Sequence, residues 1–288
     1  MVEHNGLIVK DGVYYMDPIT QMEYDEGVRF LLEGDYEKGW PLYEKSYGPF
    51  PVERWQGDYT KCVVLYNGQG FGDCMQFLRY MPMLKERCEY IEFVFDPSLE
   101  KLVTDSFPYM RPVPFGASRH KGSHRYPITS LASLFKTTVY TIPQQIPYLK
   151  AGKIQTNKKI GVCWETKAPR NARGGHPTSK NIPKELLAPL FSRSDVMSLD
   201  WSDLRTNNWA ETAAIVNSLE LVITGDFAVA HLAGALGIPV WIMLLYHNDW
   251  RWLKNRTDSP WYPTATLFRQ PRFGDWEPVT REIVSRIQ

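Results

Sequence analysis

The sequence lacks the signatures of a membrane or secreted protein. No apolar run approaches the roughly 20 residues that a membrane helix needs, and the beginning, MVEHNGLIVKDG, has neither the basic nor the long apolar region of a secretion signal. Four cysteines without a C-x-x-C pair fit neither a disulfide framework nor a zinc knuckle. We therefore expect a cytoplasmic protein with four free thiols and no transmembrane segment.

Signatures of metal and serine-nucleophile chemistry are also missing. The six histidines are scattered, and neither H-x-x-H, H-E-x-x-H nor D-x-D occurs. No G-x-S-x-G motif is present. We expect no metal site and no resident cofactor.

Acidic side chains are almost missing from the middle of the chain. Residues 106–184 carry 14 Lys and Arg against one acid, Glu165, whereas residues 1–60 carry 12 acids against 5 bases. The net charge of the whole chain is only +1. A solvated surface normally mixes both signs, so this excess indicates a surface shaped for an anion, the alternative being a chance accumulation of lysine-rich loops.

The amino-acid composition indicates a folded protein, and the sequence pattern indicates an α/β fold. With 43% apolar and 23% charged residues over 288 positions, it is too apolar for disorder and long enough for one large or two modest domains. From residue 61, short apolar runs alternate with helical stretches, as in parallel α/β layers. The runs CVVLY (62–66) and KIGVCW (159–164) each open such a series, which predicts two Rossmann-like units facing a cleft.

Three segments are expected: an N-terminal hairpin and helical pair (1–55), a first α/β domain (56–152) and a second α/β domain (153–288). The hairpin is LIVKDGVYYMD, and the helices are GVRFLLEG and YEKGWPLYEKSY. Further helices are expected over about 74–87, 97–105 and 130–135 and in IPKELLAPLF (with Pro183 at N1), WAETAAIVNSL and AVAHLAGALG. Further strands are expected in YIEFVF, DVMSL, LVITGD and VWIMLL.

The loop G-Q-G-F-G-D (68–73) joins the first buried strand to a helix. Glycines such as Gly70 and Gly72 allow close backbone approach to a ligand, and a helix N-terminus offers amides to an anion. The pattern resembles G-x-G-x-x-G with its third glycine one place early. Asp73 is either a helix cap or, at the mouth of a cleft, a general base that removes a proton from an attacking hydroxyl.

A second strand–turn–helix unit is T-G-D-F-A-V-A-H-L-A-G-A-L-G (224–237). Asp226 is either the N-cap of the helix or, with His231, a ligand of a nucleotide-like molecule whose phosphate faces the amides from Phe227 to Val229. A lone histidine on an apolar helix is more often a core residue, and that alternative stays open.

Two further loops complete the motifs. The loop 167–184 carries five Lys and Arg and suits a diphosphate, with Lys180 best placed before the next helix, unless the loop is simply solvated. The segment DWRWLKNRTDSPWYP (249–263) is expected to form a packed structural corner rather than a base-stacking platform.

Together these motifs resemble glycosyltransferase family 9 and the heptosyltransferase-like GT-B enzymes, in particular the type fused to tetratricopeptide repeats. Three blocks carry the resemblance over residues 24–288: LLEGDYEKGWPLYEKSY, GQGFGDCMQFLRYMPML, and LVITGDFAVAHLAGALGIPVWIML with DWRWLKNRTDSPWYPTATLFRQPRFGDWEPV. The resemblance implies a GT-B fold with a short repeat-like helical pair, and metal-independent, inverting transfer from a nucleotide sugar bound mainly by the second domain.

The resemblance also implies roles for single residues. Asp73 matches the general base and Lys180 a ligand of the donor phosphate. The family commonly has Thr at the position of Phe227, so a hydroxyl that could touch phosphate is missing here while the backbone contacts remain. The full expected donor site is Gly70, Gly72, Trp164, Lys180, Asp226, Phe227, Ala228 and His231. A leaving sugar diphosphate needs positive charge and an incoming hydroxyl needs a base, so the chemistry agrees.

The acceptor is expected to be a polyanion, because a diphosphate alone needs only one or two cations. The expected contacts are Arg111, Arg119, Lys121 and Arg125, around the basic loop ASRHKGSHR (117–125). A phosphorylated lipid-linked or surface glycan is favoured, and viral DNA with hydroxymethylated bases is the alternative. A protein or small-molecule acceptor stays open, as does a non-catalytic protein that binds a partner through its N-terminal helical pair.

Overall fold

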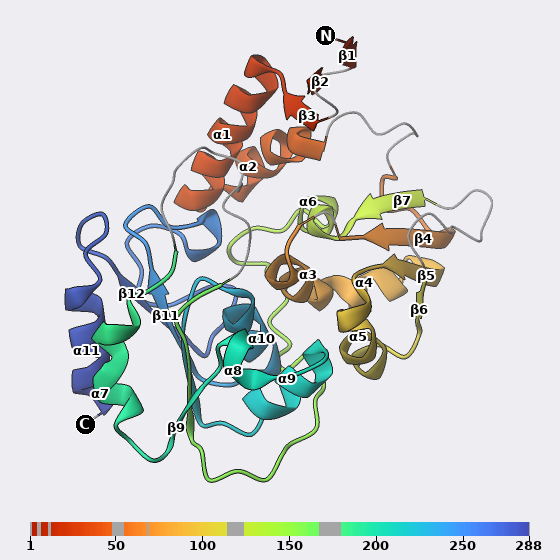
Figure 1. Ribbon diagram of the computed structural model, residues 1–288. Helices are drawn as coiled ribbons and strands as arrows, with labels where there is room; N and C mark the ends of the chain where they lie inside the picture. Colours follow the sequence, from red (N-terminus) through yellow and green to blue (C-terminus); the bar gives the residue numbers. More distant parts are fainter. Residues whose placement is uncertain are drawn as a thin grey trace.

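The computed structural model shows two parallel α/β layers with a helical pair packed across both (Figure 1). It describes residues 2–4, 7–10, 13–47, 55–67, 69–113, 124–166 and 180–287.

The N-terminal segment forms the expected hairpin and helical pair. Strands β1 (Val2–His4), β2 (Leu7–Lys10) and β3 (Val13–Met16) make an antiparallel sheet. They precede helices α1 (Pro18–Glu33) and α2 (Tyr36–Tyr43). Helix α1 begins earlier than expected because Asp17 caps it by accepting the amides of Ile19 and Thr20, and it ends at Gly34, which has a φ of 88°.

The first domain is built on a parallel sheet in the order β6-β5-β4-β7. Its strands are β4 (Thr60–Tyr66), β5 (Cys88–Val94), β6 (Met110–Pro112) and β7 (His124–Pro127). The patterns at 62–66 and 90–95 predicted the two central strands. The edge strands β6 and β7 escaped prediction because both are short and end in proline, which only edge positions tolerate.

Helices cover this sheet with one departure from the expected pattern. They are α3 (Phe71–Phe77), α4 (Met81–Lys85), α5 (Glu100–Ser106) and α6 (Leu131–Leu134). A 3₁₀ turn, η2 (Leu78–Tyr80), divides the single helix expected over 74–87 into α3 and α4. Pro82, in the first turn of α4, has no amide to donate to a carbonyl four residues earlier, which explains the break.

The second domain is a five-stranded parallel sheet in the order β12-β11-β10-β8-β9. Its strands are β8 (Ile160–Cys163), β9 (Val196–Ser198), β10 (Leu221–Gly225), β11 (Val240–Leu244) and β12 (Ala265–Arg269). Its helices are α7 (Ala188–Phe191), α8 (Trp201–Leu204), α9 (Trp209–Val216), α10 (Ala228–Leu236) and α11 (Glu277–Ile287). Pro183 is the N-cap of the 3₁₀ turn η5 (Lys184–Leu187), not the first residue of an α-helix.

The strand order reverses at one place in each sheet. In the second sheet the chain leaves β8 toward β9 on one side and returns to β10 on the other, and in the first sheet β4 lies between β5 and β7. Ligands of open α/β sheets bind beyond the carboxyl ends of the strands at such switch points. The loops that follow β4, β8 and β10 are therefore the expected places for a site.

A buried arginine joins the two domains. Arg79, in η2, donates to the carbonyl oxygens of Pro143 (3.4 Å) and Trp261 (2.8 Å). Its guanidinium carbon lies 4.9–5.1 Å from the ring centroids of Tyr148, Trp261 and Tyr262. One cation thus connects η2 of the first domain, the segment between α6 and β8, and the second domain.

Helix α2 also contacts both domains. Trp40 donates its indole N–H to the carbonyl oxygen of Thr137 (2.8 Å) in the first domain, and Tyr36 accepts the indole N–H of Trp261 (3.0 Å) in the second. The helical pair is therefore packed onto the α/β body.

The structure bears out the expectation for the cysteines: all four are buried and unpaired. Among the described residues, no helix is long and apolar enough to span a bilayer.

Candidate active site

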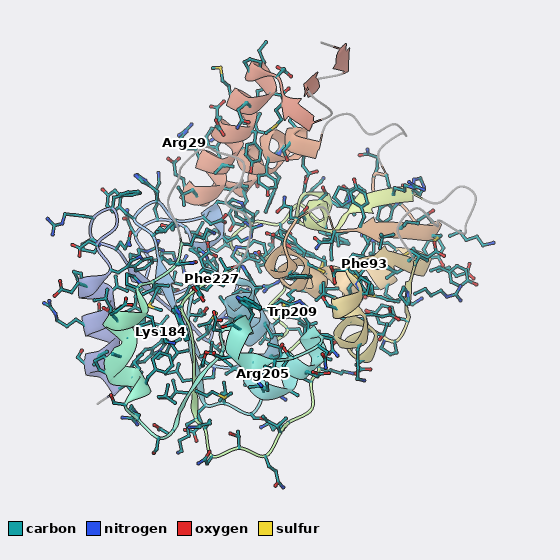
Figure 2. The ribbon with its side chains drawn as sticks, viewed as in Figure 1. Arg29, Phe93, Lys184, Arg205, Trp209 and Phe227 are labelled. Carbon is teal, nitrogen blue, oxygen red and sulfur yellow. The ribbon has the colours of Figure 1, made fainter. Side chains whose placement is uncertain are left out.

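The two helices that follow the switch-point loops pack closely against each other. A β-carbon built on Gly72 of α3 would lie 2.6 Å from Cδ2 of His231 and 3.3 Å from Cα of Ala228, both on α10. Only glycine fits there without displacement, so Gly72 has a packing role independent of any ligand. Beside this contact, Phe71 packs against Trp209 of α9 with ring centroids 5.2 Å apart, and Figure 2 shows Trp209 on the side of the second domain that faces the first.

Asp73 is held on both carboxylate oxygens. Its Oδ2 accepts the amide of Gly70 at 2.8 Å, so Asp73 does serve the N-terminus of α3, as the capping alternative predicted. Its Oδ1 accepts a hydrogen bond from Nη2 of Arg251 in the second domain. The side chain remains 22% exposed.

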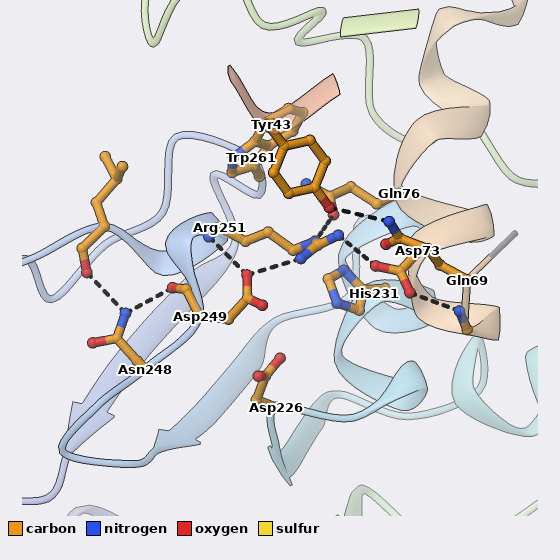
Figure 3. Close-up of polar contacts among 12 residues, drawn as sticks. Tyr43, Gln69, Asp73, Gln76, Asp226, His231, Asn248, Asp249, Arg251 and Trp261 are labelled. Atoms are coloured by element: carbon orange, nitrogen blue, oxygen red, sulfur yellow. Dashed lines mark hydrogen bonds and ion pairs between the residues drawn. The ribbon is translucent and has the colours of Figure 1, made fainter. Parts of the chain in front are cut away.

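Arg251 is the centre of the polar contacts between the domains (Figure 3). Besides Asp73, it contacts Oδ1 of Asp249 through Nη1 (2.8 Å) and Oε1 of Gln76 through Nε (2.7 Å). The guanidinium lies 4.4 Å from the ring centroid of Trp250. Burial opposes its charge, but the carboxylates of Asp249 and Asp73 outweigh burial and raise the pKa of Arg251 further above its usual value.

Lys180 and Asp226 meet at the second domain's switch point, with Lys180 Nζ 2.6 Å from Asp226 Oδ2. Burial would raise the pKa of Asp226, but the Lys180 ammonium more than offsets it and lowers that pKa. Both residues line a small pocket together with Met243, Leu244, Leu245, His247, Asn248, Asp249 and Trp276. The N-cap of α10 is Phe227 and not Asp226, so the capping alternative for Asp226 is wrong. Asp226 is part of the wall of this pocket, and its role as a donor ligand stays a prediction.

His231 has the environment of a core histidine. It is 5% exposed, shares a hydrogen bond of 2.9 Å between its Nδ1 and the Tyr262 hydroxyl, and stacks on Trp252 with ring centroids 5.4 Å apart. Burial lowers its pKa to about 4, so the imidazole is neutral at physiological pH.

Two expected donor ligands lie in the hydrophobic core. Trp164 packs against Phe191 (ring centroids 5.2 Å apart) and under the ammonium of Lys184 (4.5 Å). The ring of Phe227 covers Gly225, whose carbonyl oxygen accepts the Phe227 amide at 2.8 Å. The expected phosphate contact therefore depends on the amides of Ala228 and Val229, and the donor-binding roles of Trp164 and Phe227 stay predictions.

The expected acceptor residues are not brought together. Arg111 is on β6 and Arg125 is on β7, the opposite edges of the first sheet, with β5 and β4 between them. At about 4.8 Å per strand, they are about 14 Å apart across the sheet. Both are exposed. Arg119 and Lys121 lie outside the described residues, so their role stays a prediction.

Three residues of this site escaped the sequence analysis, namely Gln76, Asp249 and Arg251. The segment at 249–263 was expected to be a packed corner, and Trp250, Trp252 and Trp261 are indeed buried. The available signal was the order D-W-R-W, in which charged residues alternate with buried tryptophans. Such an arginine needs a carboxylate partner, and Asp73 is one.

The described residues contain no group of three or more His, Cys, Asp or Glu side chains that could hold a metal ion. Transfer without a metal stays a prediction.

Comparisons with known proteins define the fold. No family model matches the chain. Protein FlbA of Caulobacter vibrioides is 21% identical over an alignment that covers 94% of this chain and 56% of FlbA, so the chain spans little more than half of that relative. The E. coli ADP-heptose LPS heptosyltransferase II is structurally similar with a TM-score of 0.54, 11% identity and coverage of 79% of this chain and 97% of that one. E. coli heptosyltransferase WaaC, solved with ADP-2-deoxy-2-fluoro heptose, has a TM-score of 0.50, 9% identity and coverage of 79% and 100%.

These neighbours confirm the expected fold class. The chain has the GT-B architecture of two parallel α/β domains.

Proposed function

We propose that this protein is a glycosyltransferase that moves a sugar from a nucleotide sugar to an acceptor hydroxyl, with inversion and without a metal ion. The supporting observation is two ion-paired groups of residues: Asp73, Arg251 and Asp249, which join the two domains, and Lys180 with Asp226 in the second domain. Asp249, Lys180 and Asp226 line the same pocket. Such a transfer requires a carboxylate for the acceptor hydroxyl and a cation for the leaving diphosphate, and Asp73 and Lys180 are placed to supply them.

The general base and the cation for the leaving group come from different domains. Asp73 takes the proton of the acceptor hydroxyl while the hydroxyl oxygen attacks the anomeric carbon. Lys180 balances the charge that develops on the leaving diphosphate. To do so, its ammonium leaves Asp226 and binds the diphosphate instead. Attack from the side opposite the leaving group inverts the anomeric centre.

The fold similarity supports the same donor class. One solved neighbour is named for ADP-heptose and another was solved with an ADP-heptose analogue. The pocket beside Lys180 has an apolar wall of Met243, Leu244, Leu245 and Trp276, but it is too small for a nucleobase, so donor binding requires it to widen.

The acceptor belongs to the proposal as a polyanion, with a phosphorylated lipid-linked or surface glycan favoured and hydroxymethylated DNA as the alternative. The charge excess in residues 106–184 supports any polyanion. Of the four expected contacts, the structure describes Arg111 and Arg125, and both are exposed. A cytoplasmic location, a tetratricopeptide-type origin of α1 and α2, and a protein partner for this pair belong to the same proposal. The exposed Ile19 and Met22 on α1 are available to such a partner.

The test is Asp73→Asn, assayed for transfer from a panel of nucleotide sugars in EDTA. Loss of a general base lowers turnover about 10²–10⁴-fold, while donor affinity, measured by calorimetry with nucleoside diphosphates, stays unchanged. The melting temperature is expected to fall, because Arg251 loses one of its two carboxylate partners. Unchanged donor affinity, and not an unchanged melting temperature, therefore shows that the variant is folded. Turnover within about threefold of the parent sinks the role of Asp73, and loss of donor binding in EDTA sinks the metal-free mechanism.

A further inference from the structure

Helix α2 of the N-terminal pair reaches the glycine loop directly. The hydroxyl of Tyr43, at the end of α2, accepts a hydrogen bond from Nε2 of Gln69 at 3.1 Å. Gln69 immediately precedes Gly70, whose amide donates to Oδ2 of Asp73. Tyr43 is 2% exposed, so this contact is inside the protein.

The same tyrosine supports the other side of Asp73 through the second domain. Its ring meets that of Trp250 edge to face, with centroids 5.7 Å apart at 69°. Trp250 in turn carries the guanidinium of Arg251 on its face, and Arg251 donates to Oδ1 of Asp73. Figure 3 shows Tyr43 beside Arg251 and close to Gln69 and Asp73. Both oxygens of one carboxylate are thus supported from α2.

Such support matters for a general base more than for the fold. A carboxylate oxygen accepts hydrogen bonds at two lone-pair positions, so one bond on each oxygen fixes the carboxylate plane and still allows an incoming hydroxyl to bind. A base that is misplaced by about 1 Å can lose about 10²-fold in rate.

We propose that Tyr43 is a positioning residue for the reaction, and that the N-terminal helical pair is in this way a working part of the active site. This inference rests on the proposed role of Asp73. Tyr43 touches neither substrate: it acts through Gln69 and Gly70 on one carboxylate oxygen and through Trp250 and Arg251 on the other.

The test compares Tyr43→Phe with Tyr36→Phe. Both residues are on α2, both are buried, and each substitution removes one hydroxyl that accepts one N–H, from Gln69 and from Trp261 respectively. We expect Tyr43→Phe to lower kcat about tenfold with an unchanged KM for the nucleotide sugar. Tyr36→Phe should keep the parent kcat at a similar or larger loss of melting temperature. Equal kcat values for the two variants would overturn the inference.

A second variant isolates the loop contact. Gln69→Ala removes the donor of the same hydrogen bond, so the double variant with Tyr43→Phe should be no slower than the slower single variant. Rate losses that multiply would mean that the two residues act separately, and the inference fails. If Tyr43→Phe does not fold, Gln69→Ala alone decides, because a parental kcat contradicts positioning through this bond.

The outcomes separate this inference from the proposed function. An inactive parent, or an active Asp73→Asn variant, removes both. An active parent with an inactive Asp73→Asn and a fully active Tyr43→Phe removes the role of Tyr43 alone.

Discussion

Lys180 and Asp226 form an ion pair of 2.6 Å at the end of β10 where we propose that the donor diphosphate binds. The lysine is 43% exposed and the aspartate 11%, so a ligand has access to the cation while its partner is nearly covered. An anion that binds here competes with Asp226 for a lysine that is already in place.

Replacing Lys180 should therefore weaken the binding of the donor. We expect Lys180→Ala to lower the affinity for nucleoside diphosphate by about 1.5–3 kcal/mol, because a charge-assisted hydrogen bond is lost and Asp226 is left to repel the ligand. Calorimetry measures this. Lys158→Ala is the matched control, since Lys158 donates to the carbonyl oxygen of Ser194 and does not line the pocket. If the Lys180 variant and the control bind nucleoside diphosphate equally well, the diphosphate does not bind at Lys180.

Gly72→Ala should push α3 away from α10. The new β-carbon would lie 2.6 Å from the His231 ring, and overpacking of this kind costs about 1–3 kcal/mol. Urea unfolding should show a lower midpoint. Gly152→Ala is the control, because nothing lies within 4 Å of a β-carbon there. Identical midpoints would mean that the helices adjust freely and that Gly72 is not required for packing.

The stability of the protein should depend on the protonation of His231. Because burial lowers its pKa to about 4 against the usual 6.5, the unfolded chain binds a proton in this window that the folded protein does not. The free energy of unfolding should fall as pH falls from 6.5 to 4, with a slope of up to about 1.4 kcal/mol per unit. His231→Gln keeps a partner for the Tyr262 hydroxyl and should flatten this slope. Parallel curves for parent and variant would contradict the prediction.

Binding of a polyanionic acceptor should weaken steeply with salt, because arginines displace counterions from it. Arg111→Glu and Arg125→Glu, at opposite edges of the first sheet, should each reduce the salt dependence without changing donor affinity. For DNA, reversal of Arg119, Lys121 and Arg125 together should abolish gel shifts on duplex. Arg272→Glu, on the second domain and 84% exposed at its side chain, is the control. A salt-independent acceptor affinity would indicate a neutral saccharide instead.

Local signals were enough to predict most of the fold. The runs at 62–66 and 159–164 and the two strand–turn–helix units became β4, β8, α3 and α10, because buried parallel strands and packed helices have strong patterns. Strand β12 was missed although Leu267 and Phe268 are buried, since the sequence around it is rich in aromatic, charged and proline residues.

The site was only half predictable for a different reason. Asp73 and Asp226 come soon after the ends of β4 and β10, and Lys180 stands in a basic loop just before Pro183, so each has a local signal in the sequence. The partners Tyr43, Gln76, Asp249 and Arg251 come from other parts of the chain, and only the packing of two domains and a helical pair brings them to Asp73. The same limit applies to the basic residues, whose shared charge did not reveal that Arg111 and Arg125 lie on opposite edges.

Arg79 limits how the two domains can move. Pulling them apart at this point would move a buried cation away from three aromatic rings and two carbonyl oxygens contributed by Pro143, Tyr148, Trp261 and Tyr262. Each desolvated cation–ring contact is worth up to about 2 kcal/mol. Arg79 thus resists separation of the two domains at this point.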